Sequence, residues 1–225
     1  MIADALQLKL KANEIMDKPL GILIDNFIAQ FSSTIANQIN LLPWEITGNL
    51  VAIINDLILK LDTNFDVQNG IAIHKTATIE HGVTLIAPII ISENCFIGAN
   101  AYLRGGVYLD KSVKIGPGCE IKTSIICAGS CIAHFNFIGD SIIGQNVNFE
   151  AGAVTANHYN ERSDKKIAIR YKSKSIETNV EKFGSLIGDN SKIGANAVLS
   201  PGTILEANTI VNRLELIDQQ KHNKP

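Results

Sequence analysis

The sequence predicts a mainly β protein, in which a parallel β-helix of hexapeptide repeats follows an α-helical N-terminal segment. The first observation is a six-residue period of large aliphatic side chains. Its members are Ile73, Ile79, Leu85, Ile91, Ile97, Leu103, Leu109, Ile115 and Ile121. An α-helix repeats about every 3.6 residues and an uninterrupted strand about every two, so neither fits a period of six. A short strand followed by a corner does fit, with one aliphatic side chain of each strand pointing inward.

The second observation is that a small or apolar residue stands four positions after each member of this period. These residues are Ala77, Val83, Ile89, Cys95, Ala101, Val107, Val113, Cys119 and Ile125. The period then continues with two one-residue deletions, which we interpret as register corrections at corners. Its further members are Ile126, Ile132, Ile138, Ile143 and Phe149, and after an interruption Ile187, Ile193, Leu199 and Leu205. The pattern predicts a β-helix over residues 69–213, followed by a polar tail over 214–225.

Residues 1–68 have a different pattern, which predicts two or three helices. Helical spacing is followed by Leu50, Ile53, Ile54, Leu57 and Leu61, and more loosely by Phe27, Ile28, Phe31 and Ile35. The end of a solenoid is an open strand edge that needs a cover. We therefore expect these helices to pack on one end of the β-helix or on a neighbouring subunit. A substrate lid or a partner-binding helical unit is the alternative.

The interruption of the period, at about residues 157–186, predicts an insertion. It contains KKIAIRYKSKSIETN, which alternates like two strands around KSKS and therefore predicts a hairpin. A long loop in a regular solenoid is a common place for function. Its basic residues are Lys165, Lys166, Arg170, Lys172 and Lys174. A solvated hairpin face would explain them, and so would contact with an anion such as a coenzyme phosphate.

Composition excludes several classes of protein. The chain has 20 basic and 22 acidic residues, a balance without the basic excess of a nucleic-acid binder. No apolar run reaches the roughly 18 residues of a membrane span, and the N-terminus does not resemble a signal peptide. We therefore expect a cytoplasmic protein with no membrane span and no nucleic-acid partner.

Cysteine and histidine spacing argues against a metal site. Cys95 and Cys119 stand at inward positions of the repeat, where a thiol acts as a small apolar group. Cys127 and Cys131 have three residues between them, so they do not form a CxxC pair. No two of the five histidines have short ligand spacing. We expect four structural thiols and no metal requirement.

Four motifs, in a fixed order, point to a particular family. They are LRGG from Leu103, EIK from Glu120, AHFNFIGDSIIGQNVN from Ala133 and AGAVTAN from Ala151. Together they resemble the C-terminal acetyltransferase domain of the bifunctional enzymes that acetylate glucosamine 1-phosphate and uridylylate the product. The later KFGSLIGDN looks more like archaeal sugar-phosphate nucleotidylyltransferase relatives. The resemblance implies a left-handed β-helix, an exception to the usual right-handed crossover, assembled as a homotrimer with active sites between subunits.

Site residues follow from this resemblance position by position. It implies that His134 is the general base and that Arg104 and Lys122 hold the sugar phosphate. It also implies that Asn148 and Asn157 contact the amino sugar and the acetyl group. Arg104 and Lys122 are eighteen residues apart, which is three hexads, so they should stack on neighbouring coils. The alternative to a phosphate site is that nearby carboxylates, such as Asp110 or Glu120, neutralise the two cations.

The resemblance also implies a place for acetyl-CoA. The backbone N–H of Ala151 would face the thioester oxygen. The chain departs from the family at two positions. Ala195 stands where bacterial members carry a serine near acetyl-CoA, and Phe137 stands where the family has a tyrosine that touches the phosphate. A family lysine in the loop after Asn157 has no secure counterpart, although Arg162 or Lys165 could serve.

The implied function is transfer of acetyl from acetyl-CoA to the amine of an amino-sugar phosphate such as glucosamine 1-phosphate. Two alternatives stay open. One is an acyltransferase with another acceptor or donor, such as a nucleotide amino sugar or an acyl carrier protein. The other is a non-catalytic scaffold that binds a sugar nucleotide. Residues 1–68 contain no Gly-rich phosphate loop, so we do not expect nucleotidyl transfer.

Overall fold

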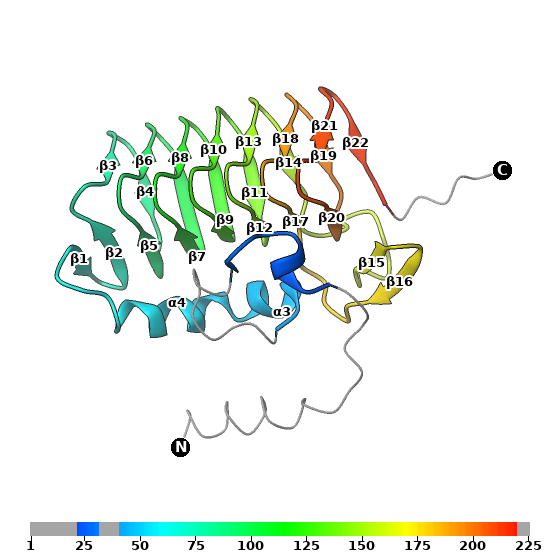
Figure 1. Ribbon diagram of the computed structural model, residues 1–225, viewed down its shortest axis with the longest axis horizontal. Helices are drawn as coiled ribbons and strands as arrows, with labels where there is room; N and C mark the ends of the chain where they lie inside the picture. The colour runs from blue at the N-terminus through cyan, green and yellow to red at the C-terminus, as the bar shows by residue number, and fades with distance from the viewer. Residues whose placement is uncertain (1–21, 32–40, 220–225) are drawn as a thin grey trace, which may run out of the picture.

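The strands wind into a left-handed parallel β-helix with three faces, which confirms the predicted fold class (Figure 1). The computed structural model describes residues 22–31 and 41–219. Face 1 is the seven-stranded sheet. Its strands are β3 (Thr78–Ile79), β6 (Phe96–Ile97), β8 (Lys114–Ile115), β10 (Cys131–Ile132), β13 (Asn148–Phe149), β18 (Lys192–Ile193) and β21 (Ile210–Val211).

Faces 2 and 3 share two long strands, β7 (Tyr102–Leu109) and β9 (Glu120–Ile126), which bend from one face to the other. Face 2 contains their first halves with β4 (Thr84–Leu85), β11 (Phe137–Gly139), β14 (Val154–Thr155), β19 (Val198–Leu199) and β22 (Leu216–Ile217). Face 3 contains their second halves with β2 (Ile71–His74), β5 (Ile89–Ile91), β12 (Ile142–Ile143), β17 (Ser185–Ile187) and β20 (Thr203–Leu205).

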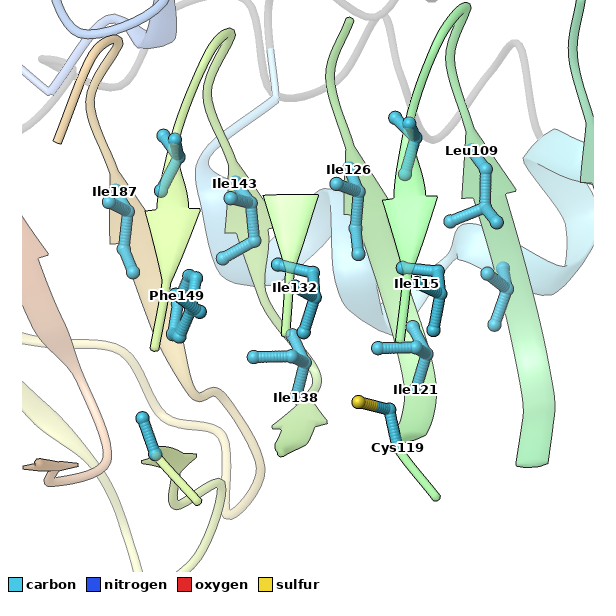
Figure 2. Packing of buried hydrophobic residues seen from close by; sticks show 14 of the residues in the cluster. Leu109, Ile115, Cys119, Ile121, Ile126, Ile132, Ile138, Ile143, Phe149 and Ile187 are labelled. Atoms are coloured by element: carbon cyan, nitrogen blue, oxygen red, sulfur yellow. The ribbon is translucent and has the colours of Figure 1, made fainter. Parts of the chain in front are cut away.

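The six-residue period forms the interior of the β-helix. Inward side chains of equivalent coils stack in ladders, such as Leu109, Ile126, Ile143 and Ile187 on face 3 (Figure 2). Each of these four is fully buried. The first deletion in the period lies at a corner, as expected: Arg104 pairs with Lys122 while Val107 pairs with Ser124, so one strand is a residue shorter there.

The N-terminal helices lie along face 3, which corrects the expectation that they cover an end of the solenoid. They are the 3-10 helix η1 (Ile24–Asn26), α3 (Pro43–Gly48) and α4 (Leu50–Ile58). Figure 1 shows α3 and α4 running along the coils, with α4 in contact with β5, β7 and β9. The physical reason is that face 3 is apolar on its outer side as well. Its outward residues Ile90, Ile125, Ile142, Leu186 and Ile204 are all at most 4% exposed.

The looser helical pattern near residue 27 forms only η1 and a short turn in the described region. Phe27, Ile28 and Phe31 are nevertheless buried in the cluster over face 3, and Ile35 lies outside the described residues. Asp189 on the β-helix holds this segment, because its carboxylate accepts the N–H of Ala29 at 2.8 Å.

The insertion contains the antiparallel strands β15 (Ala168–Tyr171) and β16 (Lys174–Glu177). Lys172 and Ser173 connect them with φ angles of 47° and 64°, a left-handed pair suited to a tight hairpin turn. Tyr171 packs on Phe27 with ring centroids 5.4 Å apart, so the insertion and the N-terminal segment share one hydrophobic cluster.

Both ends of the β-structure extend beyond the expected boundaries of 69 and 213. At the beginning, β1 (Phe65–Gln68) pairs with β2 in antiparallel register and covers the edge of the first coil. At the other end, β22 adds a strand to face 2 through Ile217. Among the described residues no helix is long and apolar enough to cross a membrane.

The cysteines are free thiols, and burial raises the pKa of Cys95 to about 11. Burial also raises the pKa of Cys119 and of Cys127. Protonated thiols at these positions act as small apolar groups, in agreement with the structural role expected for them.

Close stacking of the coils predicts that Gly116→Ala destabilises the fold by about 2–3 kcal/mol. A Cβ on Gly116 would lie 2.0 Å from the carbonyl oxygen of Ala133 on the next coil, and a backbone atom cannot move aside alone. Chemical denaturation measures the loss. Gly48→Ala is the control, because no atom lies within 4 Å of a Cβ there. Equal unfolding midpoints for the two variants would contradict the stacking.

Candidate functional site

Three of the expected site residues stack at the corner between faces 1 and 2. The N–H of Gly152 donates to the carbonyl oxygen of His134 at 2.9 Å, which places Ala151 one coil after His134. The N–H of Asn196 donates to the carbonyl oxygen of Ala151 at 3.0 Å, which places Ala195 one coil further. We call His134, Ala151 and Ala195 the His134 edge of face 2.

His134 lies at a bend of the chain and not on a flat face, and its side chain is exposed. Within the described ranges the ring has no hydrogen-bond partner. The N–H of Ala151 likewise donates to no acceptor in the described part of the chain. An exposed imidazole beside an unused N–H is an arrangement that can accept a proton and stabilise a nearby oxyanion.

Ala195 differs from Ala151, because its N–H already donates to Glu150 Oε2 at 2.9 Å. Arg213 holds the same carboxylate from the next coil, with its Nη2 2.6 Å from Glu150 Oε1. The hydrogen bond from Arg213, followed by that from Ala195, lowers the pKa of Glu150 to about 2. Of the two alanines, only Ala151 offers a free backbone donor.

Arg104 and Lys122 lie directly opposite each other on β7 and β9, near the other border of face 2. Both are paired with carboxylates. Arg104 Nε and Nη2 lie 2.8 and 2.7 Å from Glu120 Oε1, and Lys122 Nζ lies 2.6 Å from Asp140 Oδ2. The structure therefore shows the alternative in which carboxylates neutralise the two cations. Glu120 pairs with Arg104 as expected, whereas Asp110 accepts the N–H of its neighbour in the chain at 2.7 Å.

Asp140 is a site residue that the sequence reasoning missed. Its side chain is 8% exposed, and its Oδ2 accepts hydrogen bonds from both Lys122 Nζ and Asn157 Nδ2. Its φ of 45° is a left-handed conformation that Asp tolerates better than most residues. Spacing alone did not point to it, because Gly139, seventeen residues after Lys122, is the strand partner of Lys122 and Asp140 is the next residue, at the corner. We call Arg104, Lys122, Asp140 and Asn157 the Lys122 edge.

The two edges lie on opposite borders of face 2. His134 stands five residues before Gly139, the strand partner of Lys122, so His134 and Gly139 are at most about 17 Å apart even for a fully extended chain. Phe137 lies between them. Asn148 is separate, because it is exposed on face 1 between Cys131 and Lys192 of the adjoining strands.

No group of three or more His, Cys, Asp or Glu side chains in residues 22–31 and 41–219 is arranged to hold a metal ion. The site consists of a histidine, backbone donors and paired charges.

This fold and this repeat define a hexapeptide-repeat β-helix protein. Residues 186–212 match the family described as the hexapeptide repeat of succinyl-transferase. Residues 85–167, which contain most of the residues of face 2 discussed above, match the family described as the GMPPB C-terminal domain.

The resemblance to bifunctional acetyltransferases is confirmed by individual relatives. The chain is 33% identical over 183 residues to the bifunctional protein GlmU of Methanococcus vannielii, covering 79% of this chain and 43% of the relative. It is 31% identical over 170 residues to the bifunctional sugar-1-phosphate nucleotidylyltransferase/acetyltransferase of Sulfurisphaera tokodaii, covering 73% and 42%. It is 31% identical over 168 residues to the bifunctional protein GlmU of Wigglesworthia glossinidia brevipalpis, covering 75% of this chain and 32% of the relative. The chain thus spans less than half the length of these relatives.

Proposed function

We propose that the protein is a cytoplasmic, acetyl-CoA-dependent N-acetyltransferase that requires no metal, and whose acceptor is the amine of an amino-sugar phosphate of the glucosamine 1-phosphate type. One observation carries the proposal. Face 2 has an exposed imidazole with a free backbone N–H at one edge and two stacked cations at the other. The name of the Sulfurisphaera tokodaii relative, which combines sugar-1-phosphate and acetyltransferase, supports the same reaction.

The chemistry assigns one task to each group of the His134 edge. An amine attacks a thioester only as the neutral amine, and its nitrogen must lose a proton as the bond to the acetyl carbon forms; His134 accepts that proton. In the same step the thioester oxygen becomes negative, and the N–H of Ala151 donates to it. The carbon–sulfur bond breaks as the intermediate collapses, and the proton held by His134 leaves with the thiol.

The Lys122 edge binds the phosphate in this proposal, and its two cations differ in availability. The side chain of Arg104 is 37% exposed, so its guanidinium can leave Glu120 and bind two phosphate oxygens. The side chain of Lys122 is only 15% exposed and stays with Asp140. Arg104 is therefore the main mobile contact for phosphate.

Arg104→Ala should raise the acceptor KM about 10- to 100-fold, which corresponds to about 1.5–3 kcal/mol for a hydrogen bond to a charged group. The acetyl-CoA KM should change little, because the thioester is bound at the opposite edge. Steady-state kinetics with each substrate varied in turn measures both. Lys111→Ala, which removes another exposed cation, is the control. An unchanged acceptor KM in Arg104→Ala would place the phosphate elsewhere.

A homotrimer is part of the proposal. Face 2 of one subunit is open, and Asn148 lies on face 1, away from the other proposed site residues. Large apolar side chains on face 2, such as Tyr102 and Val198, are 38% and 37% exposed and suit a subunit contact. Light scattering should give about three times the chain mass of 24.4 kDa. A stable and active monomer at micromolar concentration would rule out a shared site.

The test of the reaction itself is a mass-spectrometric screen of acceptors and acyl donors with the purified protein. We expect acetylation of glucosamine 1-phosphate by acetyl-CoA. Acylation only of a nucleotide amino sugar, or only from acyl carrier protein, would replace the acceptor or the donor in the proposal. Absence of any acylated amino sugar would contradict it.

A further inference from the structure

Several groups of the Lys122 edge converge on Gly139, at the end of β11. Gly139 pairs with Lys122 across the sheet. A Cβ on Gly139 would lie 2.8 Å from Phe137 Cζ and 3.1 Å from Asn157 Cγ. The end of the phenyl ring, the amide of Asn157 and the strand position of Lys122 are thus neighbours. The residue after Asn157 is His158, an exposed histidine that has no role in the mechanism above.

Hydrogen bonds fix which nitrogen of His158 carries a proton. The carboxylate of Asp140 can only accept, so the NH2 group of Asn157 faces it and the Asn157 Oδ1 is directed away. His158 Nδ1 lies 3.2 Å from this Oδ1. Because an amide oxygen has no proton to donate, His158 Nδ1 must be the donor. Nε2 is the other ring nitrogen, and it is a donor when the imidazole carries two protons.

The backbone around His158 is held on both sides. Asn157 is buried, and its Nδ2 donates to Asp140 Oδ2. Tyr159 is also buried, and its hydroxyl donates to the carbonyl oxygen of Pro201 at 3.0 Å. These contacts position the backbone of His158, and the 3.2 Å contact of its Nδ1 with Asn157 Oδ1 places the ring beside the Lys122 edge.

The Lys122 edge has no net positive charge with which to balance a bound phosphate, so a further cation would favour phosphate binding. Arg104 with Glu120 and Lys122 with Asp140 are two ion pairs of zero net charge. A phosphate monoester carries a charge of about −1.5 to −2 at neutral pH. The phenyl ring of Phe137 has no hydroxyl to donate. A protonated imidazole at His158 would supply both a positive charge and an N–H.

We propose that His158 is a substrate-binding residue for the phosphate of the acceptor, and that it replaces the hydroxyl contact that Phe137 cannot make. In the complex, Nδ1–H donates to Asn157 Oδ1 and Nε2–H donates to a phosphate oxygen. One proton is shared between the imidazole and the phosphate, and no other bond forms or breaks. The presence of a phosphate at the Lys122 edge rests on the function proposed above, whereas binding of that phosphate by His158 can be tested without any acetyl transfer.

His158→Ala should raise the KM for glucosamine 1-phosphate about 10-fold and leave kcat and the acetyl-CoA KM nearly unchanged. The kcat/KM for unphosphorylated glucosamine should not change, because that acceptor does not reach His158. Isothermal titration of glucosamine 1-phosphate should show a similar loss of affinity without any acetyl transfer. His81→Ala, at another exposed histidine, is the matched control and should behave like wild type.

Phe137→Tyr in the His158→Ala background should recover part of the lost affinity, because the para carbon of residue 137 lies beside the same amide. Unchanged affinity for glucosamine 1-phosphate in His158→Ala would overturn the inference, as would an equal loss with unphosphorylated glucosamine. If wild type transfers no acetyl group but its binding of the sugar phosphate still depends on His158, the proposed reaction fails and this inference stands.

Discussion

Replacement of His134 by alanine is expected to lower kcat by roughly 10²- to 10⁴-fold, the range for the loss of a general base. The fold should be unaffected, because the side chain is exposed and its ring has no hydrogen-bond partner in the described residues. Surface changes of this kind usually alter the free energy of unfolding by less than about 0.5 kcal/mol. Saturating kinetics and chemical denaturation of the same preparation measure the two quantities.

His134→Gln is the informative companion, since it keeps a polar side chain of similar reach that cannot act as a base near neutral pH. It should lose as much activity as His134→Ala while binding acetyl-CoA normally. Activity within a few-fold of wild type in either variant would mean that the base is another group.

Lys122→Ala is expected to lower the free energy of unfolding by about 3–5 kcal/mol, the cost of leaving a buried charge without its partner. The Lys122 and Asp140 side chains are 15% and 8% exposed, so water cannot replace the missing ammonium beside the carboxylate. Asn157 would remain as the other side-chain donor to the same oxygen. Denaturant unfolding of the full chain measures the loss, and activity must be compared under conditions where the variant is folded.

Two further variants test whether the loss of stability in Lys122→Ala comes from the burial of the ion pair or from the loss of a charge alone. Arg104→Ala breaks the more exposed pair with Glu120 and should cost only about 0–1 kcal/mol. Lys122→Met combined with Asp140→Asn removes both charges of the pair and should be more stable than Lys122→Ala alone. If Lys122→Ala were as stable as Arg104→Ala, the buried pair would not contribute as described.

The solenoid was predictable because one aliphatic residue per strand has to point inward, and Leu109 and Ile126 occupy such positions. The cover on face 3 was not recognised, although a signal existed. Ile90, Ile125 and Ile142 each directly precede an inward residue, so these strands are apolar on both sides. Counting only the six-residue period overlooks this second set and therefore misplaces the helices.

In the site, coil arithmetic was sufficient to stack Arg104 on Lys122, because three hexads return the chain to the same face. It could not identify the partner of Lys122, since spacing places a residue on a coil but does not orient a corner side chain. Asp140 reaches Lys122 from a left-handed corner position. The role that we propose for His158 was overlooked for a similar reason, because it depends on the orientation of the Asn157 amide.

The central claim is tested most directly by incubating the purified protein with acetyl-CoA and glucosamine 1-phosphate and quantifying both products together. The account predicts N-acetylated sugar phosphate and free CoA thiol in equal amounts, and a rate that falls with His134→Ala. Thiol release without acetylated sugar phosphate, or no reaction at all, would contradict it.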